Sequence, residues 1–362
     1  MGASRMVQQW TAGVKDLFSS LHGHTTNALA RFSFAMCLSG HCHSGPLAAA
    51  AVCSAKLASV RRQWERLLAN PRFEPHEALG ELARSMLEPW AGRELLLVLD
   101  ETPGPGGLYS MRLCVVYAKR VLCVAAECYQ KHKPPVRMPK LIVRLIEQAA
   151  KALPPGAVVT FLCDRGLSWP SVMDAVRSRG WGHVLRLQKS VRVKLPDGSV
   201  VSAGELVKRR GQSWQGRATI FKKAGWRDAY VSVVWDKQCK EPWILAATED
   251  GRRGMRAAAC YAKRSWCEQS FRDEKSGGLR WDQSRLRDPV RLMKLLVVMT
   301  LATVLAVSTG TWLIKSGRRR ELDPHLLRRL SYFNMGMRWL HHLSISQEDC
   351  TSPPYLPYLH PA

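Results

Sequence analysis

Short apolar runs and amphipathic segments alternate through the middle of the chain. The runs at 94–100, 111–117, 121–127, 157–163 and 182–188 have the length of strands buried on both faces. Two segments with helical periodicity, 140–153 and 168–180, separate the last three runs. The order strand, strand, strand, helix, strand, helix, strand predicts an α/β fold, with a mixed sheet covered by helices.

Residues 189–248 return to a strand pattern. Asp197-Gly198 in VRVKLPDGSVVS is a hairpin signal, and YVSVVW shows partial alternation of apolar and polar positions. The same stretch carries 12 Lys+Arg against 5 Asp+Glu. We therefore expect a basic β subdomain inserted between the fifth strand and the segment that begins at Tyr261.

The two ends of the chain read as helical. Segments 46–70 and 74–90 predict two helices joined by NPRFEP, which suit a helix-turn-helix or a small bundle equally well. The apolar run 295–307 is about 13 residues, shorter than the roughly 20 that span a bilayer, so we expect a buried helix. A further helix is expected from about 324 to 342, and a Pro-rich, disordered tail follows.

These changes of pattern divide the chain into five parts. We expect a helical N-terminal region at 1–90, the first part of the core at 91–188, a β insertion at 189–248, the second part of the core with the C-terminal helices at 249–345, and a disordered tail at 346–362.

The charge of the chain points to a polyanionic partner. The chain has 54 Lys+Arg and 29 Asp+Glu, which gives a formal net charge of +25. This charge favours nucleic acid as the partner, and an anionic membrane surface as the second choice. Residues 189–248 hold more of this excess than residues 1–90, which carry 9 Lys+Arg and 6 Asp+Glu. MGASRMVQQWTAG contains no apolar run fit for a secretory signal, so we expect a cytoplasmic protein whose 11 cysteines are reduced.

The stretch YAKRSWCEQSFRDEK, residues 261–275, places acids among bases in a segment without Gly or Pro. On one continuous helix, four side chains fall within about 60° of one another: Tyr261, Arg264, Glu268 and Lys275. Asp273 and Glu274 point to other sides of such a helix. A solvated helix with spaced ion pairs is the alternative explanation of this pattern.

Two of the expected buried strands end in an acid, Asp100 in the first and Asp164 in the fourth. Carboxylates at the ends of neighbouring strands, met by a third from a helix, form an oxygen-rich site for Mg²⁺ or Mn²⁺. Two such ions can together promote phosphodiester cleavage. Asp100, Asp164 and Glu268 are the candidate ligands, although a strand-end Asp alone is also a common way to start a turn.

The spacing Tyr261-x2-Arg264-x3-Glu268-x6-Lys275 resembles the YREK signature of one group of bacterial insertion-sequence DDE transposases, the family of insertion sequence four. VLDET, which contains Asp100, and FLCDRG, which contains Asp164, resemble the blocks that carry the first two acids of the DDE triad. WILAATE, residues 243–249, resembles the insertion strand whose Trp takes up a flipped base. Together these stretches span residues 94–275.

The resemblance implies an RNase H-like catalytic core with a DDE triad of Asp100, Asp164 and Glu268, which binds two Mg²⁺ or Mn²⁺ ions. It implies that four residues hold phosphates or DNA beside the triad: Tyr261, Arg264, Lys275 and, through the flipped base, Trp243. Arg165, next to Asp164, is a further phosphate candidate. From the residues alone, Trp243 is more readily explained as a core residue, and the resemblance reverses this preference. Asp273 and Glu274, which the helical wheel turns to other sides, serve as controls that should keep most activity.

The resemblance also implies cut-and-paste transposition, in which a nick at the transposon end is followed by a hairpin and by joining to target DNA. The implied partners are double-stranded transposon ends and target DNA, and a second copy of the chain in a synaptic homodimer, without a membrane. The implied location is the bacterial cytoplasm, at the nucleoid. Two alternatives remain: an immobile or repurposed RNase H-like DNA-binding protein or nuclease, and an RNA-binding or membrane-surface protein that acts through its charge.

Overall fold

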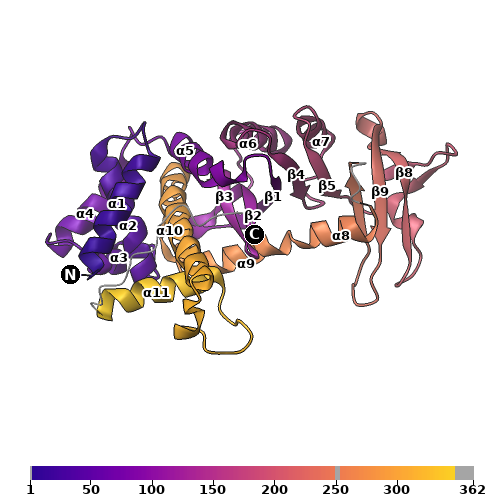
Figure 1. Ribbon diagram of the computed structural model, residues 1–362. Coiled ribbons are helices and arrows are strands. Elements are labelled where there is room, and N and C mark those ends of the chain that lie inside the picture. Colours follow the sequence, from indigo (N-terminus) through magenta and orange to yellow (C-terminus); the bar gives the residue numbers. More distant parts are fainter. Residues whose placement is uncertain (1, 249–252, 347–362) are drawn as a thin grey trace.

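The computed structural model describes residues 2–248 and 253–346. Within them, one mixed sheet of ten strands runs through the molecule in the order β3-β2-β1-β4-β5-β10-β9-β8-β6-β7. Helices cover both faces of the first half of this sheet, the N-terminal helices lie at one end of the molecule, and β8 and β9 lie at the other (Figure 1).

The first half of the sheet contains the five predicted strands, which are confirmed: β1 (Glu94–Pro103), β2 (Leu108–Tyr117), β3 (Arg120–Gln130), β4 (Val158–Cys163) and β5 (Gly182–Arg186). β1 pairs antiparallel with β2 and parallel with β4, and β4 pairs parallel with β5. Ala118 and Lys119, between β2 and β3, both have positive φ, as a tight two-residue hairpin requires. The mixed α/β architecture is as expected.

The two helices expected within the core are also present, as α6 (Met138–Ala152) and α7 (Pro170–Arg177). They lie with α5 (Pro75–Leu87) on one face of the sheet, and α8 (Met255–Ala262) and α9 (Ser265–Glu274) lie on the other (Figure 1). α6 buries Leu141, Leu145 and Ala149, which are spaced by four residues and so form one apolar stripe.

Residues 189–248 continue the sheet. Their strands are β6 (Arg192–Lys194), β7 (Val200–Ser202), β8 (Ser213–Ile220), β9 (Arg227–Val234) and β10 (Trp243–Ala247). β10 pairs antiparallel with β5, so this half is joined to the other through backbone hydrogen bonds. The predicted hairpin at Asp197-Gly198 is confirmed, since it connects β6 to β7 and Gly198 has a φ of 86°.

The N-terminal region is helical, as expected, with more helices than the sequence indicated: α1 (Gly2–Leu17), α2 (Gly23–Ser39), α3 (Ser44–Ala50) and α4 (Leu57–Ala69). The single helix expected at 46–70 is wrong, because the chain leaves the helical conformation between Ala51 and Lys56. This stretch includes Val52, Cys53 and Ser54, which are weak helix formers and offset the favourable Ala-rich composition around them.

The long apolar helix α10 (Pro289–Lys315) lies between the N-terminal helices and the sheet, where it packs against α2, α5 and β3 (Figure 1). Its 27 residues make it much longer than the expected 13-residue run, and by length and composition alone it could cross a membrane. In the structure, however, 89% of the most apolar 18-residue stretch of α10 is buried inside the molecule. The prediction of a buried helix is confirmed.

The final helix, α11 (Tyr332–Ser346), packs closely on α10. A Cβ at Gly310 would collide with the carbonyl of Tyr332, and one at Gly336 would collide with that of Ala306, so both glycines permit the contact. The expected start at 324 is wrong, because the Asp323 carboxylate accepts hydrogen bonds from the amides of Arg329 and Leu330 and holds a loop there. The tail expected to be disordered lies, from residue 347 on, outside the described residues.

Candidate active site

Asp100 and Asp164 lie next to each other at one edge of the sheet. β1 and β4 are parallel, and Leu99 is in register with Cys163, so Asp100 and Asp164 each follow the last residue of this pairing. β4 ends at Cys163, directly before Asp164, but β1 continues along β2 to Pro103, so the expectation that the first strand ends at Asp100 is wrong. In sheets of this kind the carboxyl ends of parallel strands are the usual place for a ligand. The two predicted acids are therefore brought together by the topology.

The segment 261–275 is not the single continuous helix that was expected. α8 ends at Ala262 and α9 begins at Ser265. The break is a tight turn in which the amide of Arg264 bonds to the carbonyl of Tyr261 at 2.9 Å, and Arg264 itself keeps helical dihedrals. Because the turn is nearly helical, Tyr261 and Arg264 still reach the strand-end acids.

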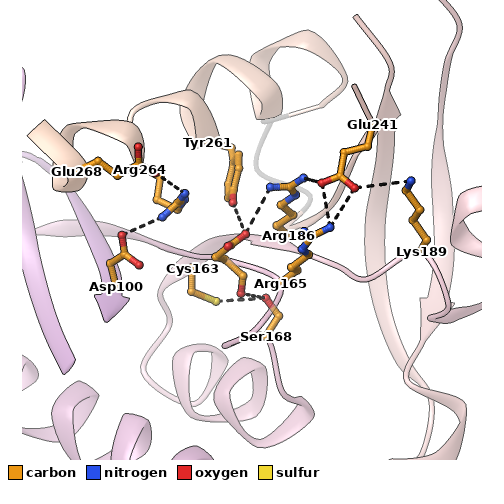
Figure 2. Close-up of polar contacts among 11 residues, drawn as sticks. Asp100, Cys163, Arg165, Ser168, Arg186, Lys189, Glu241, Tyr261, Arg264 and Glu268 are labelled. Carbon is orange, nitrogen blue, oxygen red and sulfur yellow. Dashed lines mark hydrogen bonds and ion pairs between the residues drawn. The ribbon is translucent and has the colours of Figure 1, made fainter. Parts of the chain in front are cut away.

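Arg264 joins two of the three predicted ligands. Its Nη1 donates to Asp100 Oδ2 at 2.8 Å, and its Nη2 donates to Glu268 Oε1 at 3.0 Å. Figure 2 shows this guanidinium between the strand-end acid and the helix. The acid of α9 thus reaches the site through a shared cation.

Tyr261 and Trp243 lie on the side of Asp164. The Tyr261 hydroxyl donates to Asp164 Oδ1 at 2.9 Å, and Nη1 of Arg186 lies 3.6 Å from the same oxygen (Figure 2). The half-buried Trp243 ring meets the Tyr261 ring edge-on, with centroids 5.2 Å apart. Trp243 is therefore one ring away from a predicted metal ligand.

Lys275 approaches the site from the other side. It follows the last residue of α9, and its Nζ donates to Thr102 Oγ1 on β1 at 2.9 Å. A cavity of about 400 Å³ lies here, and its lining includes Asp100, Arg264, Glu268 and Lys275. The structure thus brings all four residues of the predicted signature to the edge of the sheet where Asp100 and Asp164 lie.

The two strand-end acids differ in their electrostatic surroundings. Burial raises the pKa of Asp100 to about 6, and the charges of Asp164 and Glu268 add to this against the opposing effect of Arg264. Burial also acts to raise the pKa of Asp164, but hydrogen bonds from the Arg165 amide and the Tyr261 hydroxyl, together with the charges of Arg264 and Arg186, lower the pKa below the usual value. A cation beside Asp100 would favour its ionised form.

Asp100, Asp164 and Glu268 are of the right chemical type to bind a divalent cation, although their present spacing does not yet form one site. Three carboxylates supply the hard oxygen ligands that Mg²⁺ and Mn²⁺ prefer, and Asp100 is a buried acid repelled by its two neighbours. Among the described residues, no three acidic, His or Cys side chains come close enough to share one ion. The guanidinium of Arg264 binds Asp100 and Glu268, and it would have to turn aside for both to share an ion.

Asp273 and Glu274 point away from the site, as expected, but they are not solvated. Asp273 accepts from Arg120 Nε at 2.5 Å, and Glu274 accepts from Arg112, whose side chain is 1% exposed. The Arg112 guanidinium lies 5.1 Å from the centre of the Phe271 ring. Both acids anchor α9 to the sheet, so their replacement would be expected to affect stability, and the prediction that such variants keep most activity stays a prediction.

Three residues of the site were missed from the sequence: Arg186, Lys189 and Glu241. Arg186 ends β5 beside Asp164, and Glu241 accepts hydrogen bonds from both Arg186 and the predicted Arg165. Lys189 lies 3.6 Å from the other oxygen of Glu241. Arg186 could have been found, because it is a charged residue inside the predicted apolar run 182–188, and a charge in such a position requires a partner. The loop residue Glu241 carries no such signal.

Comparison with known proteins identifies the family. A sequence model described as the transposase DDE domain matches residues 101–305, which is more than half of the chain. The chain belongs to the transposase DDE domain family. This family consists of enzymes that cleave DNA and transfer strands with the help of divalent metal ions. The match includes Asp164 and Glu268, and Asp100 directly precedes it.

The other comparisons add little to the family assignment. No curated protein sequence matches the chain. Among solved structures, the C-terminal lobe of a budding yeast Argonaute is similar at 10% identity, with a TM-score of 0.21. The similarity covers 69% of this chain and 57% of that one, so the chain spans little more than half of its length. A TM-score of 0.21 is too low to establish a common fold.

Proposed function

We propose that this chain moves an insertion sequence by cut-and-paste transposition, with phosphodiester hydrolysis and strand transfer at a site that takes two metal ions. The observation that carries the proposal is the meeting of Asp100 and Asp164, on adjacent parallel strands, with an Arg264 that also binds Glu268. Membership of the transposase DDE domain family supports it independently.

The fold supports a finer assignment. The order β3-β2-β1-β4-β5, with β1, β4 and β5 parallel and β2 antiparallel, supports an RNase H-like core. The signature at 261–275 supports the YREK group, the family of insertion sequence four. We assign the core to 91–188 and 249–345, with the insertion at 189–248 and recognition of transposon ends in 1–90.

Each residue of the site has a proposed part. Asp100, Asp164 and Glu268 would hold Mg²⁺ or Mn²⁺, which would supply Lewis-acid stabilisation of the reacting phosphate when bound. Tyr261, Arg264 and Lys275 would position DNA phosphates. Trp243, beside the Tyr261 ring, would stack on a base that leaves the duplex if cleavage passes through a hairpin.

The partners follow from the reaction. We propose binding to double-stranded transposon ends and target DNA, a homodimer in the synaptic complex, and a place at the nucleoid in the bacterial cytoplasm. A protein acting through its charge alone would have bases without any geometric relation to the strand-end acids. Arg264 contacts Asp100 and Arg186 approaches Asp164, which favours the enzymatic function.

A cleavage and joining assay tests the function. The substrate is a DNA duplex with the sequence that flanks the gene, incubated with Mg²⁺ or Mn²⁺ and resolved on a denaturing gel. Asp100→Asn, Asp164→Asn and Glu268→Gln should each lower cleavage by about a thousandfold or more, with DNA affinity within a few-fold of wild type. Glu147→Gln, on the exposed side of α6, removes the same charge and should keep full activity.

The outcomes separate the alternatives. Substantial cleavage by Glu268→Gln would show that the metal ligands lie elsewhere. Cleavage by the wild type without joining, on every flanking sequence tested, would favour a nuclease that no longer transposes.

A further inference from the structure

Glu241 is surrounded by three cations next to the candidate active site. Nη1 of Arg165 donates to its two oxygens at 2.9 and 3.1 Å, Nη2 of Arg186 donates at 2.7 Å, and Nζ of Lys189 lies at 3.6 Å. Figure 2 shows the three basic side chains converging on this one carboxylate. The cluster has a formal charge of +2 with Glu241 included.

The cluster is attached to the catalytic edge of the sheet. Arg165 follows Asp164 directly, Arg186 is the last residue of β5, and Lys189 is three residues further on. Glu241 comes from a different element, the loop between β9 and β10. Anything that replaces the Glu241 carboxylate would therefore lie beside Asp164.

Arg186 is held in place more firmly than a surface arginine. Its side chain is only 13% exposed, and one arm of the guanidinium lies 3.6 Å from Asp164 while the other binds Glu241. Its Nε is buried and has no partner among the described residues. A guanidinium fixed in this way is ready to bind any anion that presents oxygens where those of Glu241 now lie.

The surrounding cations stabilise the Glu241 carboxylate as an anion. Burial acts to raise the pKa of Glu241, but the hydrogen bond from Arg165 and the charges of Arg165, Arg186 and Lys189 lower it below the usual value. Glu241 is nevertheless 31% exposed and lies on a loop, so it can leave the cluster without unfolding the sheet.

We propose that Arg165, Arg186 and Lys189 form a phosphodiester-binding site in which Glu241 is a resident carboxylate that a DNA phosphate displaces. The proposal rests on the proposed function, since that function supplies DNA as the source of the phosphate. Carboxylate and phosphate oxygens accept the same paired hydrogen bonds from arginine, so the exchange keeps the geometry of the cations. The bound phosphate would be anchored one residue from Asp164.

The exchange makes Glu241 a competitor of DNA. In the wild type, DNA must break three favourable contacts of Glu241 before it gains its own. Removal of the carboxylate charge should therefore strengthen binding. A cluster that only ties the β9–β10 loop to β4 and β5 would behave differently, because loss of Glu241 would then lower stability and leave DNA affinity unchanged or reduced.

The experiment compares the full chain with Glu241→Gln, which keeps the size of the side chain and removes its charge. Binding of a fluorescent DNA duplex is measured by anisotropy in EDTA over a series of salt concentrations. We expect Glu241→Gln to bind about fivefold more tightly, with a salt dependence steeper by about one counterion. Arg186→Gln should weaken binding by about tenfold in either background.

Glu147→Gln is the matched control. It removes one negative charge from the exposed side of α6, which lies on the face of the sheet opposite α8 and α9 (Figure 1). It should change affinity by less than about twofold. An equal gain for Glu147→Gln would show that net charge alone explains the effect and would overturn the proposal.

Other outcomes are equally decisive. Unchanged or weaker DNA binding by Glu241→Gln, with a lower melting temperature, would make the cluster a structural tie. Parallel cleavage assays keep the two proposals apart: wild-type cleavage with an unaltered Glu241→Gln affinity overturns only the phosphate site. Tighter binding by Glu241→Gln with no cleavage by the wild type overturns only the transposase activity, and no DNA binding by any variant overturns both.

Discussion

Arg264 donates a hydrogen bond to Asp100 over 2.8 Å, and this pair connects the turn between α8 and α9 to β1, at the point where β1 stops pairing with β4. The Asp100 side chain is 16% exposed, so its charge is poorly solvated and depends on the guanidinium. The cation that stabilises this acid also binds Glu268. Arg264 and a metal ion would therefore compete for the same oxygens.

Replacement of Arg264 should have opposite effects on stability and on metal affinity. Arg264→Gln leaves Asp100 to be repelled by Asp164 and Glu268, so we expect a lower melting temperature in EDTA. The same change removes a positive charge from the oxygens that would bind the ion, and Mn²⁺ affinity should rise by about threefold to tenfold. Isothermal titration calorimetry and thermal unfolding, both without DNA, measure the two effects.

Arg256→Gln is the control for this experiment, because Arg256 is an exposed base on α8 and its loss changes the net charge equally. It should alter neither quantity appreciably. Weaker Mn²⁺ binding by Arg264→Gln would mean that the guanidinium organises the acids for the ion and does not compete with it.

The ion pair of Arg112 and Glu274 should be essential for stability. Arg112 is almost fully buried between Phe271 and Trp281, so Glu274→Gln leaves a buried charge without its counterion. We expect a loss of about 3 to 5 kcal/mol in the free energy of unfolding. Urea unfolding measures this loss, and cleavage should fall with it because α9 carries Glu268.

A double replacement separates the charge from the packing. Arg112→Met combined with Glu274→Leu removes both charges and keeps most of the volume, so stability should return to within about 2 kcal/mol of wild type. If the double variant were as unstable as Glu274→Gln, the packing of Arg112 on its aromatic neighbours would be the dominant contribution.

The four acids Asp100, Asp164, Asp273 and Glu274 differ in how far their surroundings follow from the sequence. Asp100 and Asp164 were predicted because each follows an apolar run, and parallel pairing of those runs places them together. Helical periodicity correctly predicted that Glu274 points away from the site, but it could not predict which residues α9 contacts on that side. That Arg112 meets Glu274 depends on the pairing of β1 with β2 and on the docking of α9, which are set by contacts far apart in sequence.

The same limit applies to the ends of elements. The break between α8 and α9 contains no Gly or Pro from which it could be predicted. The loop before α11 is held by hydrogen bonds that the Asp323 carboxylate accepts. Neither follows from local propensity. The β insertion was expected as a separate subdomain, yet β10 pairs with β5 and makes one sheet of both halves.

His183 should make the protein sensitive to acid. It is fully buried on β5, and both ring nitrogens lack a partner among the described residues. Burial, with a further contribution from Arg177, lowers the pKa of His183 from 6.5 to about 3. The unfolded chain therefore binds this proton at a higher pH than the folded one, and stability is lost as the pH falls from about 6.5 towards 3.

His183→Phe removes this proton and the two unpaired nitrogens and keeps a ring of similar shape. At pH 4 the free energy of unfolding of the variant should exceed that of wild type by about 3 kcal/mol. At pH 7.5, where His183 is neutral in both states, the two free energies should differ much less. Urea unfolding at several pH values measures the difference. A constant offset from pH 7.5 to pH 4 would show that His183 does not titrate in this range.

Trp243 tests whether the insertion takes part in the chemistry. The ring is half-buried and lies edge-on to Tyr261, which itself binds Asp164, so both a packing role and a DNA-stacking role have a structural basis. Stacking of a flipped base on an aromatic ring contributes roughly 1 to 3 kcal/mol. If the reaction passes through a hairpin, that surface is needed after the first nick and not before it.

We therefore expect Trp243→Ala to leave the first metal-dependent nick within about twofold of wild type and to slow hairpin formation and resolution by about tenfold. Trp243→Phe keeps an aromatic face and should recover most of the rate. A gel that resolves nicked, hairpin and fully cut ends separates the steps, and thermal unfolding of the same proteins separates packing from stacking. A large drop in melting temperature with equal loss of every product would make Trp243 a core residue, because a fault in folding affects all steps alike.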